Sequence, residues 1–288
     1  MLEKMTREAM LLKKKEAPKI PTVKDMRLTY GNKPYSVPIL SEPPKSVVSK
    51  LISTFATMPT LVLAVDIETH GWPEGKDFKD LVGAFGFYTT RDKEQLDFSR
   101  VVQIGWIVGT TDLGDEPWIS KEYLVKPDGF EVSKKATDFH KIHHSQAVNE
   151  GLPLRDVLAE FMRDAADVAE QGGRVVAHQL EFDGGIIRRE LERCRMFDLE
   201  KRWFAMATKG FCTMDPWACT WVRRCFGLPV RGTESEKSLM SVRDLLELLV
   251  PGHKDLLARA HTANADAEMC RLVYIPYCNL VTMAEGSL

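Results

Sequence analysis

The sequence lacks several features that would assign a protein to a specialised class. No run approaches the ~18 consecutive apolar residues of a membrane span. The six cysteines include no CxxC pair, so the close-set ligands of a structural zinc site are missing. The N-terminus carries Glu3 and Glu8 where a secretory signal would have an apolar block. We therefore expect an intracellular protein with reduced thiols and no membrane partner, cytoplasmic or nuclear, and targeting to an organelle stays open.

A strong basic excess, which would point to nucleic acid, is also missing, because the formal net charge is −2. The charge is distributed unevenly. Residues 1–50 hold nine Lys and two Arg against five Asp and Glu, and the rest of the chain is acidic. A nuclease can confine its positive charge to one groove while carboxylates hold its metals, so the overall sum does not exclude nucleic acid as a partner.

The composition that is present fits a globular domain with an extension. Hydrophobic residues make up 44% of the chain and charged residues 28%, as in ordinary globular proteins. Residues 1–45 hold six of the fifteen prolines and the run Lys13–Lys15, which predicts a basic N-terminal extension. We assign residues 46–288 to one domain with a long polar insertion at about 70–99.

Hydrophobic periodicity predicts an α/β fold with one mixed sheet. Short apolar runs indicate strands at 61–65, 101–108, 118–125 and 174–178. Apolar residues at helical spacing, with their capping signals, indicate helices at 46–57, 154–169, 182–196, 241–249 and 263–275. Residues 134–149 are helical or turn-like, a further helical region surrounds 217–225, and Pro276 should stop or bend the last helix.

Two carboxylates follow the first strand. Asp66 and Glu68 come directly after the apolar run at 61–65. Side chains two residues apart in a strand point to the same face, so both carboxylates emerge together. Like charges this close raise each other's proton affinity unless a cation intervenes, and Mg²⁺ prefers such oxygen ligands. A lone Asp-x-Glu is also common in solvated turns.

Two further acidic segments complete a pattern. Asp183 follows the strand at 174–178, near the start of a helix, and Asp266 opens the last helix. Acids in a first helical turn are often explained by the helix dipole alone. His261 stands five residues before Asp266, although a lone His is more often structural than catalytic. The combination of three such segments in one chain favours a shared site.

The segments VDIETHG, VVAHQLEFDGG and HTANADAEMCRLVY resemble the three exonuclease motifs of the DEDDh family of 3′→5′ exonucleases, which belongs to the ribonuclease H-like superfamily. Asp66 and Glu68 match the first motif, Asp183 the second, and His261 and Asp266 the third. Softer matches are FHKIHHSQAVNEG and VVQIGWIV, and the resemblance covers roughly residues 60–276. It implies a ribonuclease H-like α/β fold, with a central mixed sheet of about five strands flanked by helices.

The resemblance also implies a chemistry. The four acids would hold two Mg²⁺ or Mn²⁺ ions, and His261 would act as the general base that activates the attacking water. Thr69, His70 and Gly71 occupy the positions where family members contact the terminal nucleotide. The substrate would be DNA or RNA with a free 3′ end, and the sequence leaves open whether the chain forms a homodimer.

Departures from the family pattern and competing functions stay open. Gln103 stands where many relatives have Glu, and Gln179 where Asn is common, which leaves substrate details undecided.

The alternative functions are a non-catalytic nucleic-acid-binding protein on the same fold and a ribonuclease H-like endonuclease. The predicted helix at 182–196, which follows the second motif, carries a basic run, and we favour a solvated face over phosphate contacts for it. Its members are Arg188, Arg189, Arg193 and Arg195.

Overall fold

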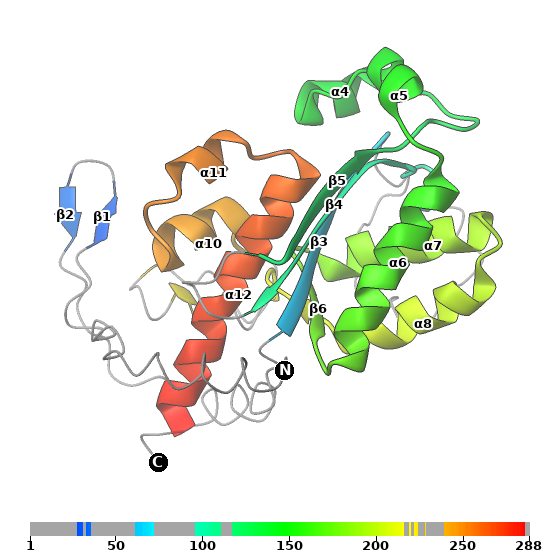
Figure 1. Ribbon diagram of the computed structural model, residues 1–288. Coiled ribbons are helices and arrows are strands. Elements are labelled where there is room, and N and C mark those ends of the chain that lie inside the picture. Colours follow the sequence, from blue (N-terminus) through cyan, green and yellow to red (C-terminus); the bar gives the residue numbers. More distant parts are fainter. Residues whose placement is uncertain are drawn as a thin grey trace, which may run out of the picture.

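The fold is that of a computed structural model, shown in Figure 1. It describes residues 28–30, 33–35, 61–71, 96–110, 117–215, 219, 222–223, 228 and 239–285. The predicted helix at 46–57, most of the extension at 1–45 and most of the insertion at 70–99 lie outside the described residues. Within the extension, β1 (Leu28–Tyr30) and β2 (Lys33–Tyr35) pair as an antiparallel hairpin.

A five-stranded mixed sheet forms the centre of the molecule, in the order β5-β4-β3-β6-β7. β3 pairs antiparallel with β4 and parallel with β6, β4 pairs antiparallel with β5, and β6 pairs parallel with β7. The strands are β3 (Leu61–Thr69), β4 (Val101–Thr110), β5 (Ile119–Leu124), β6 (Arg174–Ala177) and β7 (Phe211–Cys212). The predicted central mixed sheet of about five strands is confirmed.

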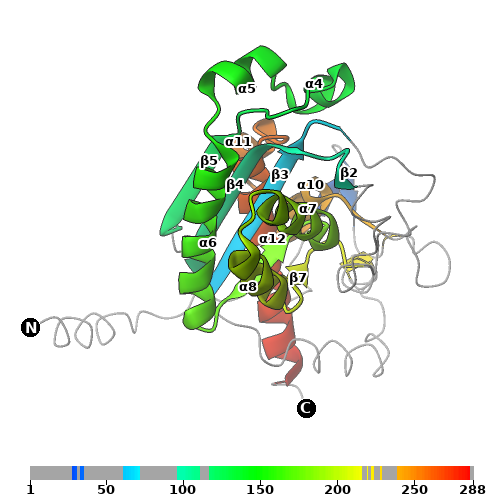
Figure 2. The same ribbon diagram turned by 90° about the vertical axis from the view of Figure 1, so that its right-hand side faces the viewer.

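Helices cover both faces of the sheet (Figures 1 and 2). One face packs against α6 (Leu154–Glu170), α7 (Leu180–Arg193) and α8 (Phe197–Ala207). The other packs against α10 (Val242–Leu249), α11 (Lys254–Ala258) and α12 (Ala263–Glu285). Within the described residues, no helix combines the length and apolar character that crossing a bilayer requires.

The alternation of side chains in β3 decides which way its acids point. Val62 and Ala64 belong to the core with α12, whereas Leu63 and Val65 belong to the core with α6 and α7. Because successive residues of a strand face opposite sides, Asp66 shares the α12 side. The central strand therefore aims its acids at the last helix.

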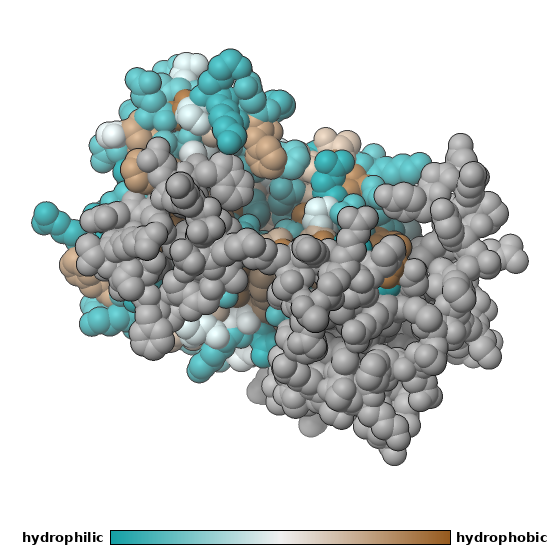
Figure 3. All heavy atoms as spheres, turned by 180° about the vertical axis from the view of Figure 1, so that it is seen from behind, coloured by the Kyte–Doolittle hydropathy of each residue, from teal (hydrophilic) through white to brown (hydrophobic). Residues whose placement is uncertain are grey.

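Two short helices lie beyond the carboxyl end of β3. They are α4 (Lys134–His140) and α5 (His144–Glu150), which occupy the predicted helical or turn-like region. His140 Nε2 lies 3.3 Å from the Thr69 carbonyl oxygen, which joins α4 to the end of the strand. From behind, this part of the surface is mainly hydrophilic with some hydrophobic side chains (Figure 3), and Phe139 is 54% exposed.

The predicted elements agree with the structure except in a few places. The four strands and the helices at 154–169, 182–196 and 241–249 are found, and β7, α8 and α11 were not predicted. The last helix does not stop at Pro276 but continues to Glu285. Proline removes one helical hydrogen bond. The preceding Val273, Tyr274 and Ile275 are fully buried, and this packing holds the helix against the sheet.

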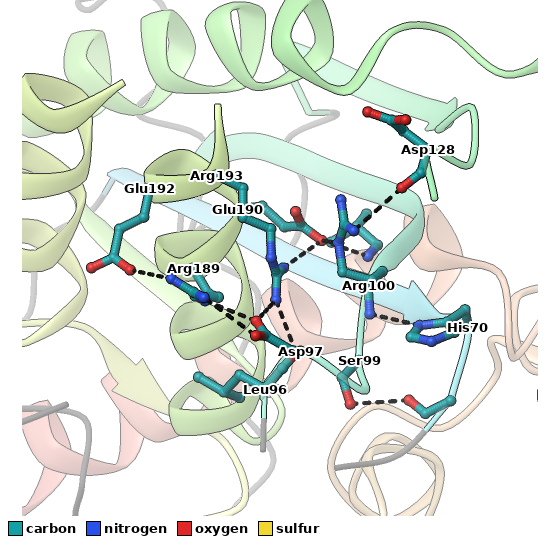
Figure 4. Close-up of polar contacts among 12 residues, drawn as sticks. His70, Leu96, Asp97, Ser99, Arg100, Asp128, Arg189, Glu190, Glu192 and Arg193 are labelled. Atoms are coloured by element: carbon teal, nitrogen blue, oxygen red, sulfur yellow. Dashed lines mark hydrogen bonds and ion pairs between the residues drawn. The ribbon is translucent and has the colours of Figure 1, made fainter. Parts of the chain in front are cut away.

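The arginines of α7 form ion pairs, so the solvated face that the sequence favoured is wrong for three of them. Arg189 and Arg193 both pair with Asp97, and Arg193 also pairs with Glu190 (Figure 4). Arg188 pairs with Glu200 of α8. Periodicity in the sequence cannot show which acids from distant segments lie opposite these side chains. The remaining member of the run, Arg195, is exposed.

Candidate metal centre and active site

Three acids from two elements meet at the face of the sheet that α12 covers. Asp66 and Glu68 come from β3, and Asp266 comes from the first turn of α12. One carboxylate oxygen from each lies within 4.8 Å of the others. Glu68 is 7% exposed, so solvent screens the repulsion between these carboxylates only weakly. The cluster joins residues about 200 positions apart in the sequence, as the motif pattern predicted.

Asp183 lies close to this cluster but outside the group of three. It stands in the first turn of α7 and is 3% exposed. Its Oδ2 atom is buried and has no hydrogen-bond partner in the part of the chain that the structure describes. Its charge adds to burial in raising the pKa of Asp66. A buried carboxylate oxygen without a hydrogen-bond donor fits a site that binds a cation.

The electrostatics of the cluster are those of a site that needs positive charge. Burial and the charges of Asp266 and Asp183 raise the pKa of Glu68 to about 9. Burial also raises the pKa of Asp266, to about 6, against the lowering effects of the His261 backbone N–H and Arg243. Divalent cations would neutralise this repulsion, so the residues fit Mg²⁺ or Mn²⁺.

His261 lies on the turn that leads into α12. Its backbone is left-handed, with φ of 70°, and its N–H donates to both carboxylate oxygens of Asp266 at 3.3 and 3.2 Å. Its ring packs against the exposed Phe139 of α4, with centroids 4.4 Å apart. Burial, followed by the charges of Arg243 and Lys141, lowers the pKa of His261, which favours the neutral ring that a base requires.

Phe139, Lys141 and Arg243 were missed as site residues by sequence reasoning. Phe139 and Lys141 come from the α4 segment, and Arg243 from the start of α10. The tertiary fold brings all three near His261. Phe139 belongs to a segment that matches the family only softly, and no spacing in the sequence distinguishes it from a core phenylalanine.

The three predicted nucleotide contacts form a tight turn after Glu68. Thr69 Oγ1 donates to the Gly71 carbonyl at 2.8 Å, and Ser99 Oγ donates to the same oxygen at 3.0 Å. The Arg100 backbone N–H donates to His70 Nδ1 at 2.8 Å (Figure 4). Since Nδ1 accepts this hydrogen bond, the neutral ring carries its proton on Nε2. Both ends of the insertion are thus held together beside the cluster.

Gln179, one of the departures from the family pattern, has a backbone role. It precedes α7 with φ of 86°, in the left-handed region. Asn adopts this region more readily than Gln, because its short amide bonds to the local backbone. The turn connects β6 to the helix that carries Asp183, so its conformation affects the placement of that acid.

Comparison with known proteins bears on the fold alone. No protein-family model matches the chain, and no curated protein matches it significantly. E. coli Exonuclease I in complex with a dT13 oligonucleotide superposes with a TM-score of 0.52 at 15% identity, over 79% of this chain and 42% of that one. The protein therefore shares the fold of this structure, and the predicted ribonuclease H-like α/β fold is confirmed.

Two further solved structures agree with this fold. The RNase domain of the yeast Pop2 protein gives a TM-score of 0.53 at 13% identity, over 84% of this chain and 90% of that one. E. coli Exonuclease I with a dA16 oligonucleotide gives 0.52 at 17% identity, over 78% of this chain and 42% of that one. The chain thus spans less than half of Exonuclease I but most of the Pop2 domain.

Proposed function

We propose that the protein is a metal-dependent 3′→5′ exonuclease that hydrolyses phosphodiester bonds of DNA or RNA from a free 3′ end. The observation that carries the proposal is the meeting of Asp66, Glu68 and Asp266 within 4.8 Å, with the backbone N–H of His261 donating to Asp266. The similar fold of Exonuclease I with bound oligonucleotide supports nucleic acid as the substrate class.

Asp66, Glu68, Asp183 and Asp266 would hold two Mg²⁺ or Mn²⁺ ions. Bound there, the ions would neutralise the carboxylates and stabilise the negative charge that develops on the phosphoryl oxygens and on the leaving 3′ oxygen. Two observations support this ligand set. The buried Oδ2 of Asp183 has no hydrogen-bond partner among the described residues, and the pKa values of the other acids are raised.

His261 would act as the general base. Its lowered pKa keeps the imidazole neutral near pH 7, and the turn before α12 holds it beside Asp266. Packing against Phe139 limits the orientations of the ring. The imidazole takes a proton from the attacking water, and the hydroxide attacks the phosphorus atom as the 3′ oxygen departs.

Two groups of residues would contact the substrate, one near the His261 ring and one at the end of β3. Lys141 and Arg243 supply positive charge near its ring, where the phosphates of a bound strand would run. Thr69, His70 and Gly71 are proposed to contact the terminal nucleotide, because they follow Glu68 directly at the end of β3. His70 Nε2 carries the proton that such a contact would use.

The deciding experiment is a substrate panel with 5′-labelled single- and double-stranded DNA and RNA, in Mg²⁺, in Mn²⁺ and in chelator. The wild-type protein should shorten linear strands one nucleotide at a time from the 3′ end, only with metal. Asp66→Asn should abolish cleavage, whereas Asp167→Asn, a change to an exposed acid on α6, should leave it unaffected.

The same panel separates the alternatives. A circular single strand should stay intact, and its cleavage would indicate an endonuclease instead. Binding of labelled strands without metal-dependent cleavage would indicate a non-catalytic nucleic-acid-binding protein. Cleavage that persists in chelator or in Asp66→Asn would refute the metal mechanism.

A further inference from the structure

The first turn of α12 lies directly on β4 at Gly105. A Cβ atom added at Gly105 would lie 2.3 Å from the Asn264 backbone nitrogen and 2.4 Å from the Ala263 carbonyl carbon. Side chains do not approach a backbone this closely, so only glycine permits the contact. The start of the helix and the strand beneath it are therefore in direct backbone contact.

Two side chains of the sheet accept hydrogen bonds from the start of the helix. Ala263 N donates to Gln103 Oε1 at 3.0 Å, and Asn264 N donates to Glu122 Oε1 at 2.9 Å. The first N–H groups of a helix have no partner inside it, and usually a capping side chain or water satisfies some of them. Here strands β4 and β5 supply the acceptors.

These contacts lie in the same rows of the sheet as the acids of β3. Asp66 pairs with Gly105, which pairs in turn with Glu122, and Glu68 pairs with Gln103. Directly paired residues of neighbouring strands point to the same face of a sheet. The groups that hold α12 are thus the immediate neighbours of the β3 acids.

Asp266 and His261 are both tied to the start of α12. Asp266 follows Ala263 by three residues, which is about one helical turn. His261 is joined to Asp266 by its backbone N–H. A shift of the helix start along the sheet would therefore change the distance from the Asp266 carboxylate to the acids of β3.

We propose that Gln103, Gly105 and Glu122 are positioning residues, which fix the start of α12 so that Asp266 completes the metal centre with the acids of β3. This inference rests on the metal centre of the proposed function. All three act on Asp266 through the α12 backbone, which they contact at Ala263 and Asn264. Gln103 supplies an uncharged acceptor next to Glu68, and Leu at that position would have similar size but no acceptor.

The test compares Gln103→Leu with Gln103→Glu, which keeps an acceptor, and with the matched control Gln171→Leu at the exposed end of α6. Mn²⁺ affinity is measured by titration calorimetry without substrate, and amide hydrogen exchange is followed over residues 261–268. Gln103→Leu should weaken Mn²⁺ binding about tenfold and speed exchange at Ala263, because it leaves a buried donor unpaired.

Gln103→Glu should bind Mn²⁺ no more weakly than the wild type, and Gln171→Leu should bind Mn²⁺ with the same affinity as the wild type. Gly105→Ala should weaken binding more than Gln103→Leu does, and if it fails to fold, the Gln103 pair decides. Wild-type Mn²⁺ affinity in Gln103→Leu, with active wild-type enzyme, overturns the positioning role alone. A wild type that binds no Mn²⁺ and cleaves nothing overturns the metal centre, and this inference with it.

Discussion

Replacing Glu68 by Gln should stabilise the metal-free protein and remove its response to divalent cations. Burial and the charges of Asp266 and Asp183 raise the pKa of Glu68 from its usual 4.5 to about 9. The folded protein therefore keeps a proton that the unfolded chain releases above pH 4.5. Since folding retains that proton, the free energy of unfolding falls as the pH rises from 4.5 to about 9.

The size of the effect follows from this difference in pKa. Each pH unit above 4.5 lowers the free energy of unfolding by about 1.4 kcal/mol, which reaches about 3 kcal/mol at pH 7. Gln keeps the shape of the side chain without its charge. Because Glu68→Gln removes this loss of unfolding free energy, it should raise Tm by up to roughly 6 °C for a domain of this size.

Calorimetric melting in chelator, from pH 5 to pH 8, measures the effect. The Tm of Glu68→Gln should exceed that of the wild type by a margin that grows with pH, and Mn²⁺ should raise the Tm of the wild type only. Glu170→Gln, at an exposed position on α6, is the matched control and should follow the wild type. Equal Tm values for Glu68→Gln and wild type across this range would refute the repulsion on which the metal site is argued.

Three further predictions follow from other parts of the structure. His261→Gln should lower kcat by about a hundredfold or more with Mn²⁺ affinity unchanged, and an unchanged kcat would refute the role of His261 as the base. The wild-type enzyme should stay active down to a pH below the usual His pKa of 6.5, because burial lowers the pKa of His261. Glu190→Ala should lower the free energy of unfolding in urea by about 3 kcal/mol, because it leaves Arg100 without its fully buried partner and the buried Val101 N–H without its acceptor. A loss below about 1 kcal/mol would contradict this. Gln179→Asn should raise stability by about 0.5 kcal/mol, measured by thermal melting, because Asn accepts φ of 86° more readily; a destabilised variant would show that the Gln side chain has a contact role.

Much of the fold could be predicted because the core elements carry strong periodic signals. The apolar run at 61–65 and the amphipathic segment at 154–169 correspond to β3 and α6. Elements with weak local signals were missed. β7 has only two residues, and α11 has five, so neither shows a period of its own. Pro276 was misjudged in part, because packing outweighs the lost hydrogen bond.

For the candidate site, too, the sequence could predict some residues and not others. Asp66, Glu68 and Asp266 could be chosen from motif spacing, and the structure brings them together. The predicted ligand Asp183 stays a prediction, because it lies outside that group. The contacts that hold the site had no signal of their own. Gln103 looked like a family variation with an unknown effect, whereas in the structure it accepts a hydrogen bond from the start of α12.

The sequence by itself determined which residue types could perform metal chemistry and the α/β class of the fold, because strand and helix periods and motif spacing are local properties of the chain. Only the tertiary structure decided that Gly105 lets α12 approach β4, that Phe139 packs against His261, and that Asp97 pairs with the arginines of α7. These contacts depend on distances between segments far apart in the sequence, and the register of the sheet and the packing of the helices determine those distances.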